Sequence, residues 1–189
     1  MEAIVRFPSN SSYSENKNVK GFIKFYQNNN NYVTVHVNLQ GLPTGIHGFH
    51  IHENPIKQEY INKMKNGEVV KNLCATLGGH FNPFNEYHGS NITPSKHVGD
   101  LINNLHVSDD KKVNIIFNDN FISLHKDKKN CILNKSIVIH ESPDDYGIPG
   151  WIALYKNKKL TEKEEESLKT GNAGKRIACG NISLLTNNF

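Results

Sequence analysis

The chain has 189 residues, of which 37% are hydrophobic and 21% charged, with a formal net charge of +4, a mean hydropathy of −0.56 and a pI near 8.8. This length suits one domain spanning residues 1–189, and no apolar run approaches the roughly 20 residues of a membrane helix, so we expect no membrane partner. The lysines are scattered without a recognition-helix motif, which argues against nucleic acid, and residues 1–8 contain no apolar stretch of signal-peptide length, so we expect a cytoplasmic protein.

Short alternating segments dominate the chain. Between residues 32 and 40, apolar Val33, Val35, Val37 and Leu39 alternate with polar residues, which is the pattern of a strand with one buried face. Regularly spaced short strands predict an all-β sandwich or barrel. Segments of similar character, separated by clusters of Gly, Pro, Asn and Asp, lie at 3–7, 21–26, 113–117, 137–140 and 177–185.

A different pattern interrupts the strands between residues 53 and 73. Ile56, Tyr60, Ile61 and Met64 have helical spacing, and Gly67 follows them. We therefore expect a short amphipathic helix whose apolar stripe packs on the core.

A second long segment, residues 146–170, contains the chain's only tryptophan, Trp151. Thr161 and Glu164 have the spacing of a capping box, and Gly171 suits the position after a last helical turn. These signals predict an exposed helix over residues 162–169.

Histidines and one aspartate recur at metal-ligand spacing through the middle of the chain. His50 and His52 form a His-x-His pair, and the alternation of a strand places both imidazoles on one face. Imidazole suits zinc, copper, nickel or iron, and histidines with one carboxylate are a common zinc set. Taken singly, any one of the ten histidines is more often a surface or core residue than a ligand. The joint pattern offers too many ligands for one tetrahedral ion and enough for two ions that share a bridging histidine: His50, His52, His80, His88, His97, Asp100 and His140.

The three cysteines, Cys74, Cys131 and Cys179, are too few for a disulfide-rich scaffold. Taken alone, they indicate reduced thiols.

Five motifs together resemble the copper/zinc superoxide dismutase family. They occur in the family's order, and the similarity extends from about residue 2 to residue 185. The motifs are G-I-H-G-F-H-I-H-E (45–53), G-G-H-F-N-P (78–83), H-V-G-D-L (97–101), V-I-H-E-S-P-D-D (138–145) and G-N-A-G-K-R-I-A-C-G (171–180).

The resemblance implies a fold and a set of ligands. The expected fold is an eight-stranded Greek-key barrel or immunoglobulin-like sandwich with long metal-binding and electrostatic loops, and residues 53–73 and 146–170 are longer than the family's usual loops. Asp144 matches an aspartate that accepts hydrogen bonds from one ligand of each metal. The copper ligands are matched by His50, His52, His80 and His140, and the zinc ligands by His80, His88, His97 and Asp100, with His80 as the bridge.

The resemblance also implies roles outside the ligand set. Arg176 matches the active-site arginine that docks a small anion, and His80 is the other catalytic residue. Cys74 and Cys179 match the family's disulfide, which leaves Cys131 as a free thiol. The remaining matches are Lys169 and Thr170 at the rim of the substrate channel, Glu165 and Glu166 as its acidic companions, His47 as a structural histidine, and His36, His106 and His125 as surface histidines.

The activity implied is that of an oxidoreductase converting superoxide to dioxygen and hydrogen peroxide through Cu(II)/Cu(I) cycling, with the histidine-bridged zinc as a structural and tuning ion. The implied partners are superoxide, a copper chaperone and a second copy of the chain, because the family's disulfide loop contributes to a homodimer interface. The alternatives are a non-catalytic copper/zinc-binding protein and a purely structural sandwich. Arg176 argues against the former, because a metal buffer does not need a group that docks an anion.

Overall fold

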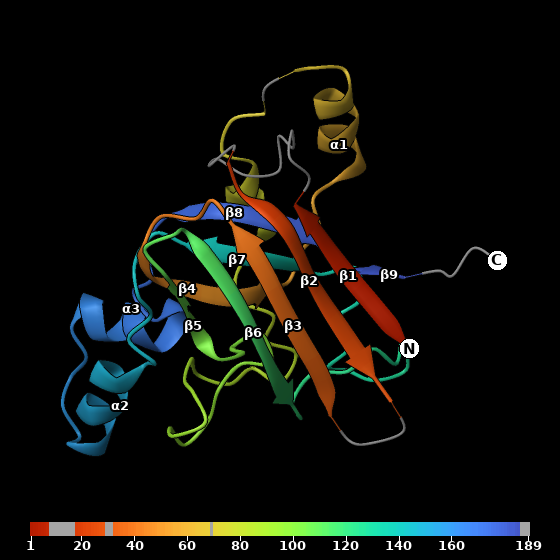
Figure 1. Cartoon of the computed structure of the whole chain (residues 1–189). Helices are drawn as coiled ribbons and strands as arrows, with labels where there is room; N and C mark the ends of the chain where they lie inside the picture. Colours follow the sequence, from red (N-terminus) through yellow and green to blue (C-terminus); the bar gives the residue numbers. More distant parts are fainter. Residues whose placement is uncertain (8–17, 29–31, 69, 186–189) are drawn as a thin grey trace.

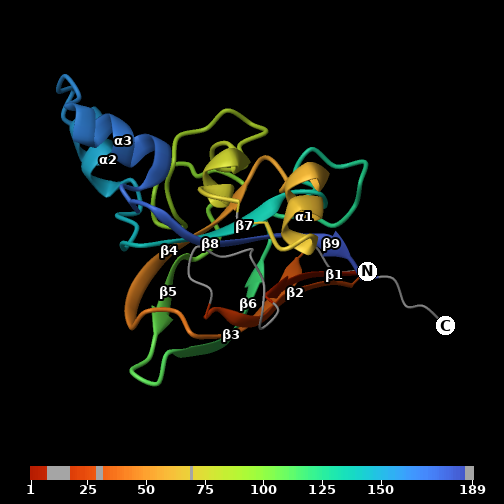
Figure 2. The same cartoon turned by 90° about the horizontal axis from the view of Figure 1, so that it is seen from above.

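The protein is a sandwich of two antiparallel sheets, seen in two orientations in Figure 1 and Figure 2. The structure is a computed structural model that describes residues 1–7, 18–28, 32–68 and 70–185. One sheet has the strand order β6-β3-β2-β1-β9 and the other β5-β4-β7-β8. The strands are β1 Glu2–Phe7, β2 Lys20–Gln27, β3 Val33–Gln40, β4 Gly45–His52, β5 Asn103–Val107, β6 Lys112–Asp119, β7 Ser136–His140, β8 Arg176–Asn181 and β9 Ser183–Leu184.

The predicted all-β fold is confirmed in its sandwich form. Within the described ranges, the two sheets are not hydrogen-bonded into a closed barrel. Val33, Val35, Val37 and Leu39 of β3 are buried and alternate with more exposed residues, as their period of two requires. The strand β5 carries two adjacent asparagines, has little alternation, and was not predicted from the pattern.

The strand β4 differs from the others because both of its faces are covered. Phe49 and Ile51 point into the core between the sheets, so His50 and His52 occupy the opposite face. Both histidines are nevertheless buried, because the segment between β4 and β5 folds back over that face and pairs with it at His52 and His80.

The helix predicted before Cys74 is present as α1, Gln58–Lys65. Figures 1 and 2 show it well apart from the other two helices. Met64 is buried in a small cluster that includes Ile56, Cys74 and Cys179, so the apolar stripe packs as expected. The 3₁₀ helix η1, Leu73–Leu77, follows it and carries Cys74.

The second long segment forms a pair of helices. The predicted helix is α3, Glu162–Thr170, and its capping box between Thr161 and Glu164 is confirmed. One face of α3 is buried at Ser167 and Leu168, so it is less exposed than expected. It packs on α2, Ile148–Tyr155, which the sequence did not predict because Pro149 and Gly150 indicate a turn rather than a helix. The proline is accommodated in the first turn of α2.

Candidate metal centre

The first group of candidate ligands consists of His50 and His52 on β4, His140 at the end of β7, and His80 from the loop that covers β4. All four are buried, and one ligand atom from each lies within 4.8 Å of the others. The antiparallel pairing of β4 with β7 places His52 opposite Ser136 and His50 opposite Val138. Strand pairing therefore brings together ligands that are about 90 residues apart in sequence.

Hydrogen bonds orient two of these imidazoles. His52 Nδ1 lies 3.0 Å from the carbonyl of Gly78, and His140 Nδ1 lies 3.0 Å from the carbonyl of Gly174. A carbonyl only accepts, so each Nδ1 carries the hydrogen and each Nε2 keeps its lone pair. The two Nε2 atoms lie 3.4 Å apart, so both lone pairs are available at one point, as a metal requires.

The second group consists of His80, His88, His97 and Asp100. All four residues belong to the long segment between β4 and β5 rather than to a strand. Asp100 is at its centre: its carboxylate lies 2.8 Å from His80 Nδ1, 3.0 Å from His88 Nδ1 and 3.3 Å from His97 Nδ1. It also accepts the backbone N–H of His97 at 2.8 Å and that of Gly89 at 3.1 Å.

Asp144 connects the two groups. Its carboxylate accepts His50 Nε2 at 2.7 Å and His88 Nε2 at 3.1 Å. Asn104 holds the backbone of Asp144 by donating to its carbonyl at 3.0 Å and accepting its N–H at 2.8 Å. The carboxylate thus bonds one histidine of each group, in the position expected from the sequence.

Buried ring nitrogens within the two groups are suited to bind metal ions. His50 Nδ1 and His80 Nε2 are buried without a hydrogen-bond partner among the described residues, whereas His88 Nδ1 and His97 Nδ1 lie beside the carboxylate of Asp100. A buried polar atom without a partner is costly, and metal coordination would satisfy each of these nitrogens. The donor set of imidazoles with one carboxylate suits copper and zinc.

The histidines of the first group, including the shared His80, have lowered pKa values, whereas His88 of the second group has a raised one. Burial lowers the pKa of His50 and His52 well below the usual value and that of His140 to about 4, so these imidazoles stay neutral, as ligands must. Burial also disfavours the charged form of His88, but hydrogen bonds to Asp100 and Asp144 raise its pKa to about 10. Burial likewise opposes ionisation of Asp100, yet hydrogen bonds from the three histidines around it hold its pKa well below the usual value.

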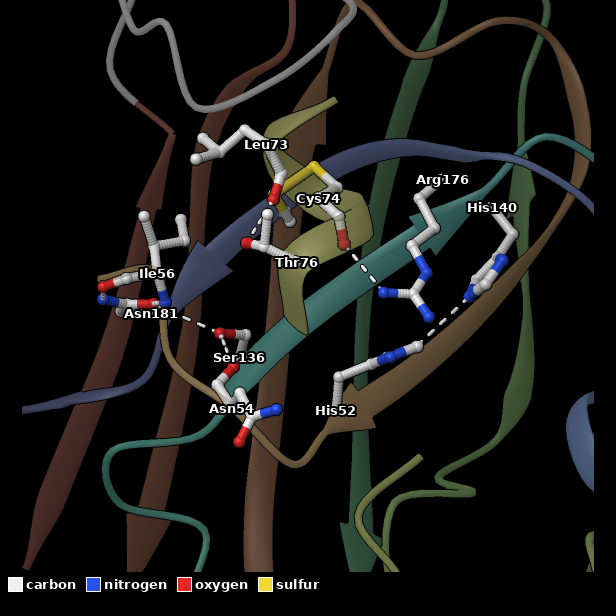
Figure 3. Close-up of a disulfide and its surroundings, with 11 residues drawn as sticks. His52, Asn54, Ile56, Leu73, Cys74, Thr76, Ser136, His140, Arg176 and Asn181 are labelled. Carbon is white, nitrogen blue, oxygen red and sulfur yellow. Dashed lines mark hydrogen bonds between the residues drawn. A yellow bond between two sulfur atoms is a disulfide. The ribbon is translucent and has the colours of Figure 1, made fainter. Parts of the chain in front are cut away.

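A cavity of about 300 Å³ leads to the first group. Arg176 lies beside His140 and His52, as Figure 3 shows. Its guanidinium donates to the carbonyl of Cys74 at 2.8 Å and to that of Gly78 at 2.6 Å. The cavity is lined by His52, Gly79, His80, His140, Glu166, Thr170, Asn172, Ala173, Gly174 and Arg176.

The predicted channel residues are divided between the cavity wall and the outer surface. Thr170 and Glu166 line the cavity and are hydrogen-bonded to each other at 2.6 Å. Lys169 and Glu165 are exposed and do not belong to its lining.

The disulfide between Cys74 and Cys179 is present, with a Cα–Cα distance of 5.7 Å. It joins η1 to β8 (Figure 3). Because Arg176 is on β8 and bonds the carbonyl of Cys74, the disulfide holds both partners of that contact. Cys131 is a free, half-buried cysteine, as expected.

The other histidines lie outside both groups. His47 is buried and its ring nitrogens contact the carbonyls of His140 and Pro43, each at 2.9 Å, which agrees with a structural role. His106 and His125 are exposed, whereas His36 is half-buried and packs edge-on against Phe22.

Sequence reasoning missed several residues that support the site. Lys96 is buried and donates to the carbonyl of Asp100 at 2.9 Å. Asn103 donates to the carbonyl of Gly89 at 2.9 Å, and the indole of Trp151 donates to the carbonyl of His88 at 3.0 Å. All three bond backbone atoms, and no side-chain pattern in a sequence reveals such partners.

Comparison with known proteins places the chain in a family. A family model for copper/zinc superoxide dismutase matches residues 19–182. The chain belongs to the copper/zinc superoxide dismutase family. As in that family, its metals are copper and zinc and its activity is that of an oxidoreductase acting on superoxide.

Several members of the copper/zinc superoxide dismutase family are similar over most of their length. The extracellular superoxide dismutase of Brugia pahangi is 36% identical, with 91% of this chain and 73% of the relative covered. Superoxide dismutase A of Xenopus laevis is 38% identical, with 87% and 89% covered. A crystal structure described as that of the clock protein EA4 has a TM-score of 0.70 and 31% identity, with 97% of this chain and 94% of that chain covered.

The expectation of a cytoplasmic protein is wrong. The relative from Brugia pahangi and a 36% identical relative from Drosophila melanogaster, with 90% of this chain and 79% of the relative covered, are both named extracellular superoxide dismutases. The disulfide between Cys74 and Cys179 also agrees with an oxidising compartment. In the part of the chain that the structure describes, no helix has the length and apolar character to cross a membrane.

Proposed function

We propose that this protein disproportionates superoxide outside the cell. In this proposal copper is held by His50, His52, His80 and His140, and zinc by His80, His88, His97 and Asp100. The observation that carries the proposal is that His80 belongs to both groups: its Nδ1 faces Asp100 at 2.8 Å, while its buried Nε2 is one of the nitrogens without a hydrogen-bond partner in the described chain. This arrangement supports the proposal that one imidazole serves two ions.

When bound, the metals would supply the electron chemistry, with copper cycling between Cu(II) and Cu(I) and zinc, which has no redox chemistry, tuning its neighbour. Overall, two superoxide anions and two protons give one dioxygen and one hydrogen peroxide. The protein's contribution is to dock the anion, deliver a proton and exclude larger molecules.

Arg176 is the residue that would dock the anion. Its guanidinium is permanently charged and is held by two carbonyls, so part of its donor fork is oriented before substrate arrives. It lines the same cavity as His52, His80 and His140. A small anion bonded to Arg176 would therefore lie beside the copper ligands, as proximity catalysis requires.

His80 Nε2 is a suitable position for a proton. When it is not bound to copper, this buried nitrogen of a cavity-lining residue would hold a proton within reach of a docked anion. Thr170 and Glu166 line the same cavity and are hydrogen-bonded to each other.

Metal analysis of the purified protein combined with a superoxide dismutation assay tests the proposal. One copper and one zinc per chain with rapid dismutation are expected. Stoichiometric metals without dismutation would favour the alternative, a non-catalytic copper/zinc-binding protein. Secretion is tested separately by comparing the protein content of the medium with that of the cells.

We also propose a homodimer and loading by a copper chaperone. A two-fold interface near the disulfide would use the half-buried Tyr60 and Ile61 of α1, with the exposed Lys57, Lys63 and Lys65 at its wet edge. Analytical ultracentrifugation of the oxidised, metal-loaded protein tests this, and a monomer at tens of micromolar would contradict it. Copper uptake from a chaperone that outpaces uptake from free copper would support the second proposal.

A further inference from the structure

The main chain of His88 is held on both sides by the α2–α3 pair. Its N–H donates to the carbonyl of Leu168 in α3 at 2.8 Å, and its carbonyl accepts the indole Nε1–H of Trp151 in α2 at 3.0 Å. Both polar main-chain groups of this residue are therefore satisfied by helices that lie about 60 to 80 residues further along the chain.

The packing around this contact is close. A Cβ on Gly150 would lie 2.3 Å from Leu168 Cγ, so α2 and α3 approach each other at a glycine. Gly147, at φ +71°, adjoins the same carbonyl, because a Cβ there would lie 2.5 Å from the oxygen of His88. The indole of Trp151 also packs edge-on against the ring of Tyr87, with centroids 5.7 Å apart.

We propose that Trp151 is a positioning residue for the zinc ion. Its indole N–H fixes the main chain of His88, so that the imidazole keeps Nε2 on Asp144 and Nδ1 beside Asp100. The inference rests on the proposed function, which assigns His88 to zinc. It gives the inserted helix α2 a specific task that the ligands themselves do not perform.

The physical reason is the cost of ordering a loop. His88 does not belong to a strand whose hydrogen bonds would orient it. The entropy cost of ordering its backbone therefore arises either before or during zinc binding. A buried carbonyl that loses its donor also loses a favourable interaction. A donor that holds His88 in the binding conformation beforehand therefore raises zinc affinity, as outer hydrogen bonds to metal ligands generally do.

Trp151→Phe tests the proposal, because it removes the N–H and keeps a ring that can pack against Tyr87. Zinc affinity, measured by competition with a chelating dye, should fall by roughly tenfold. Cobalt substituted for zinc should show a shifted visible absorption spectrum, since His88 would be less well oriented. Copper affinity should remain near that of the wild type, because His50, His52 and His140 lie on strands.

Tyr155→Phe is the matched control. Tyr155 lies on the same helix, is 89% exposed, and also loses one polar hydrogen in this substitution. The zinc affinity and cobalt spectrum of the Tyr155→Phe variant should equal those of the wild type. If the indole N–H does not position His88, Trp151→Phe behaves like this control, and that result would overturn the proposal.

A measurement on the wild type keeps the proposal testable if the Trp151 variant does not fold. Coupling between sites is reciprocal, so if the indole bond favours zinc, zinc must favour the indole bond. The chain has one tryptophan and hence one indole N–H resonance. Its exchange with solvent should slow when zinc binds, and an unchanged exchange rate would refute the inference.

His88→Ala separates this inference from the assignment on which it rests. Loss of zinc in His88→Ala together with wild-type behaviour of Trp151→Phe would reject the role of Trp151 and leave the ligand assignment standing. Retention of zinc in His88→Ala would instead reject the assignment itself.

Discussion

The two halves of the metal centre are built in different ways. Three ligands of the proposed copper group, His50, His52 and His140, lie on paired strands β4 and β7. Three ligands of the proposed zinc group, His88, His97 and Asp100, lie on a long loop without a strand of its own. In the first half the sheet positions the ligands, whereas in the second half individual hydrogen bonds must do so.

The difference shows where each half is vulnerable. A strand ligand is held by ladder bonds shared with its neighbours, so changes elsewhere affect it little. The loop ligands depend on individual hydrogen bonds, among them those from Lys96 to the carbonyl of Asp100 at 2.9 Å and from Trp151 to that of His88 at 3.0 Å. We therefore expect copper loss to require a ligand substitution, and zinc loss to follow from substitutions around the ligands as well.

The largest effect is expected from His140→Ala. His140 belongs to the copper group alone, so the variant should lose copper and dismutation while keeping most of its zinc. Metal content by mass spectrometry and a dismutation assay check this. Full activity in a copper-replete variant would contradict the ligand assignment.

Asp100→Ala should instead remove zinc and loosen the loop. The carboxylate contacts three histidines and two backbone N–H groups, and breaking a buried charged network of this kind costs about 3–5 kcal/mol of stability. Zinc stoichiometry and urea unfolding measure the two effects. Asp100→Asn is the control that keeps the shape of the side chain and removes its charge. Unchanged zinc content in the alanine variant would contradict the assignment of Asp100 to zinc.

Arg176→Gln should lower the second-order rate by roughly tenfold, because a charge-assisted hydrogen bond to the anion is lost. The wild-type rate should also fall as salt shortens the Debye length from about 10 Å at 0.1 M to about 3 Å at 1 M, and the variant should show a flatter salt dependence. Lys169→Gln should have a weaker effect because Lys169 lies outside the cavity lining. A wild-type rate independent of salt would leave electrostatic steering without support.

The metal-free protein should show opposite pH responses in the two halves. The pKa of His140 is lowered to about 4, so the unfolded chain binds more protons between pH 4 and 6.5 and stability falls as pH drops through this window. The pKa of His88 is raised to about 10, so its contribution is complete below pH 6.5 and is lost as pH rises toward 10.

Urea unfolding of the metal-free protein across pH 4–10 measures both responses. His140→Ala should flatten the acidic side of the profile, and His88→Ala the alkaline side. If both variants flattened the same side of the profile, the two halves would not differ in the pH dependence of their stability.

The fold could be predicted where local patterns are strong. The alternation of β3 and the capping box of α3 each depend on neighbours in sequence, and both are confirmed. The helix α2 was missed because Pro149 and Gly150 weaken its local signal. Its conformation depends on contact with α3 at Gly150 and Leu168, which is a tertiary interaction.

By itself, the sequence determined the candidate ligands, because the period of a strand and the order of five motifs define them without coordinates. Only the tertiary structure decided which nitrogen of each imidazole is free for a metal. The carbonyls of Gly78 and Gly174 that orient His52 and His140 belong to the backbone, which every residue shares and no motif marks. The same reason applies to the indole of Trp151: its partner is a carbonyl 63 residues away, and folding alone brings the two together.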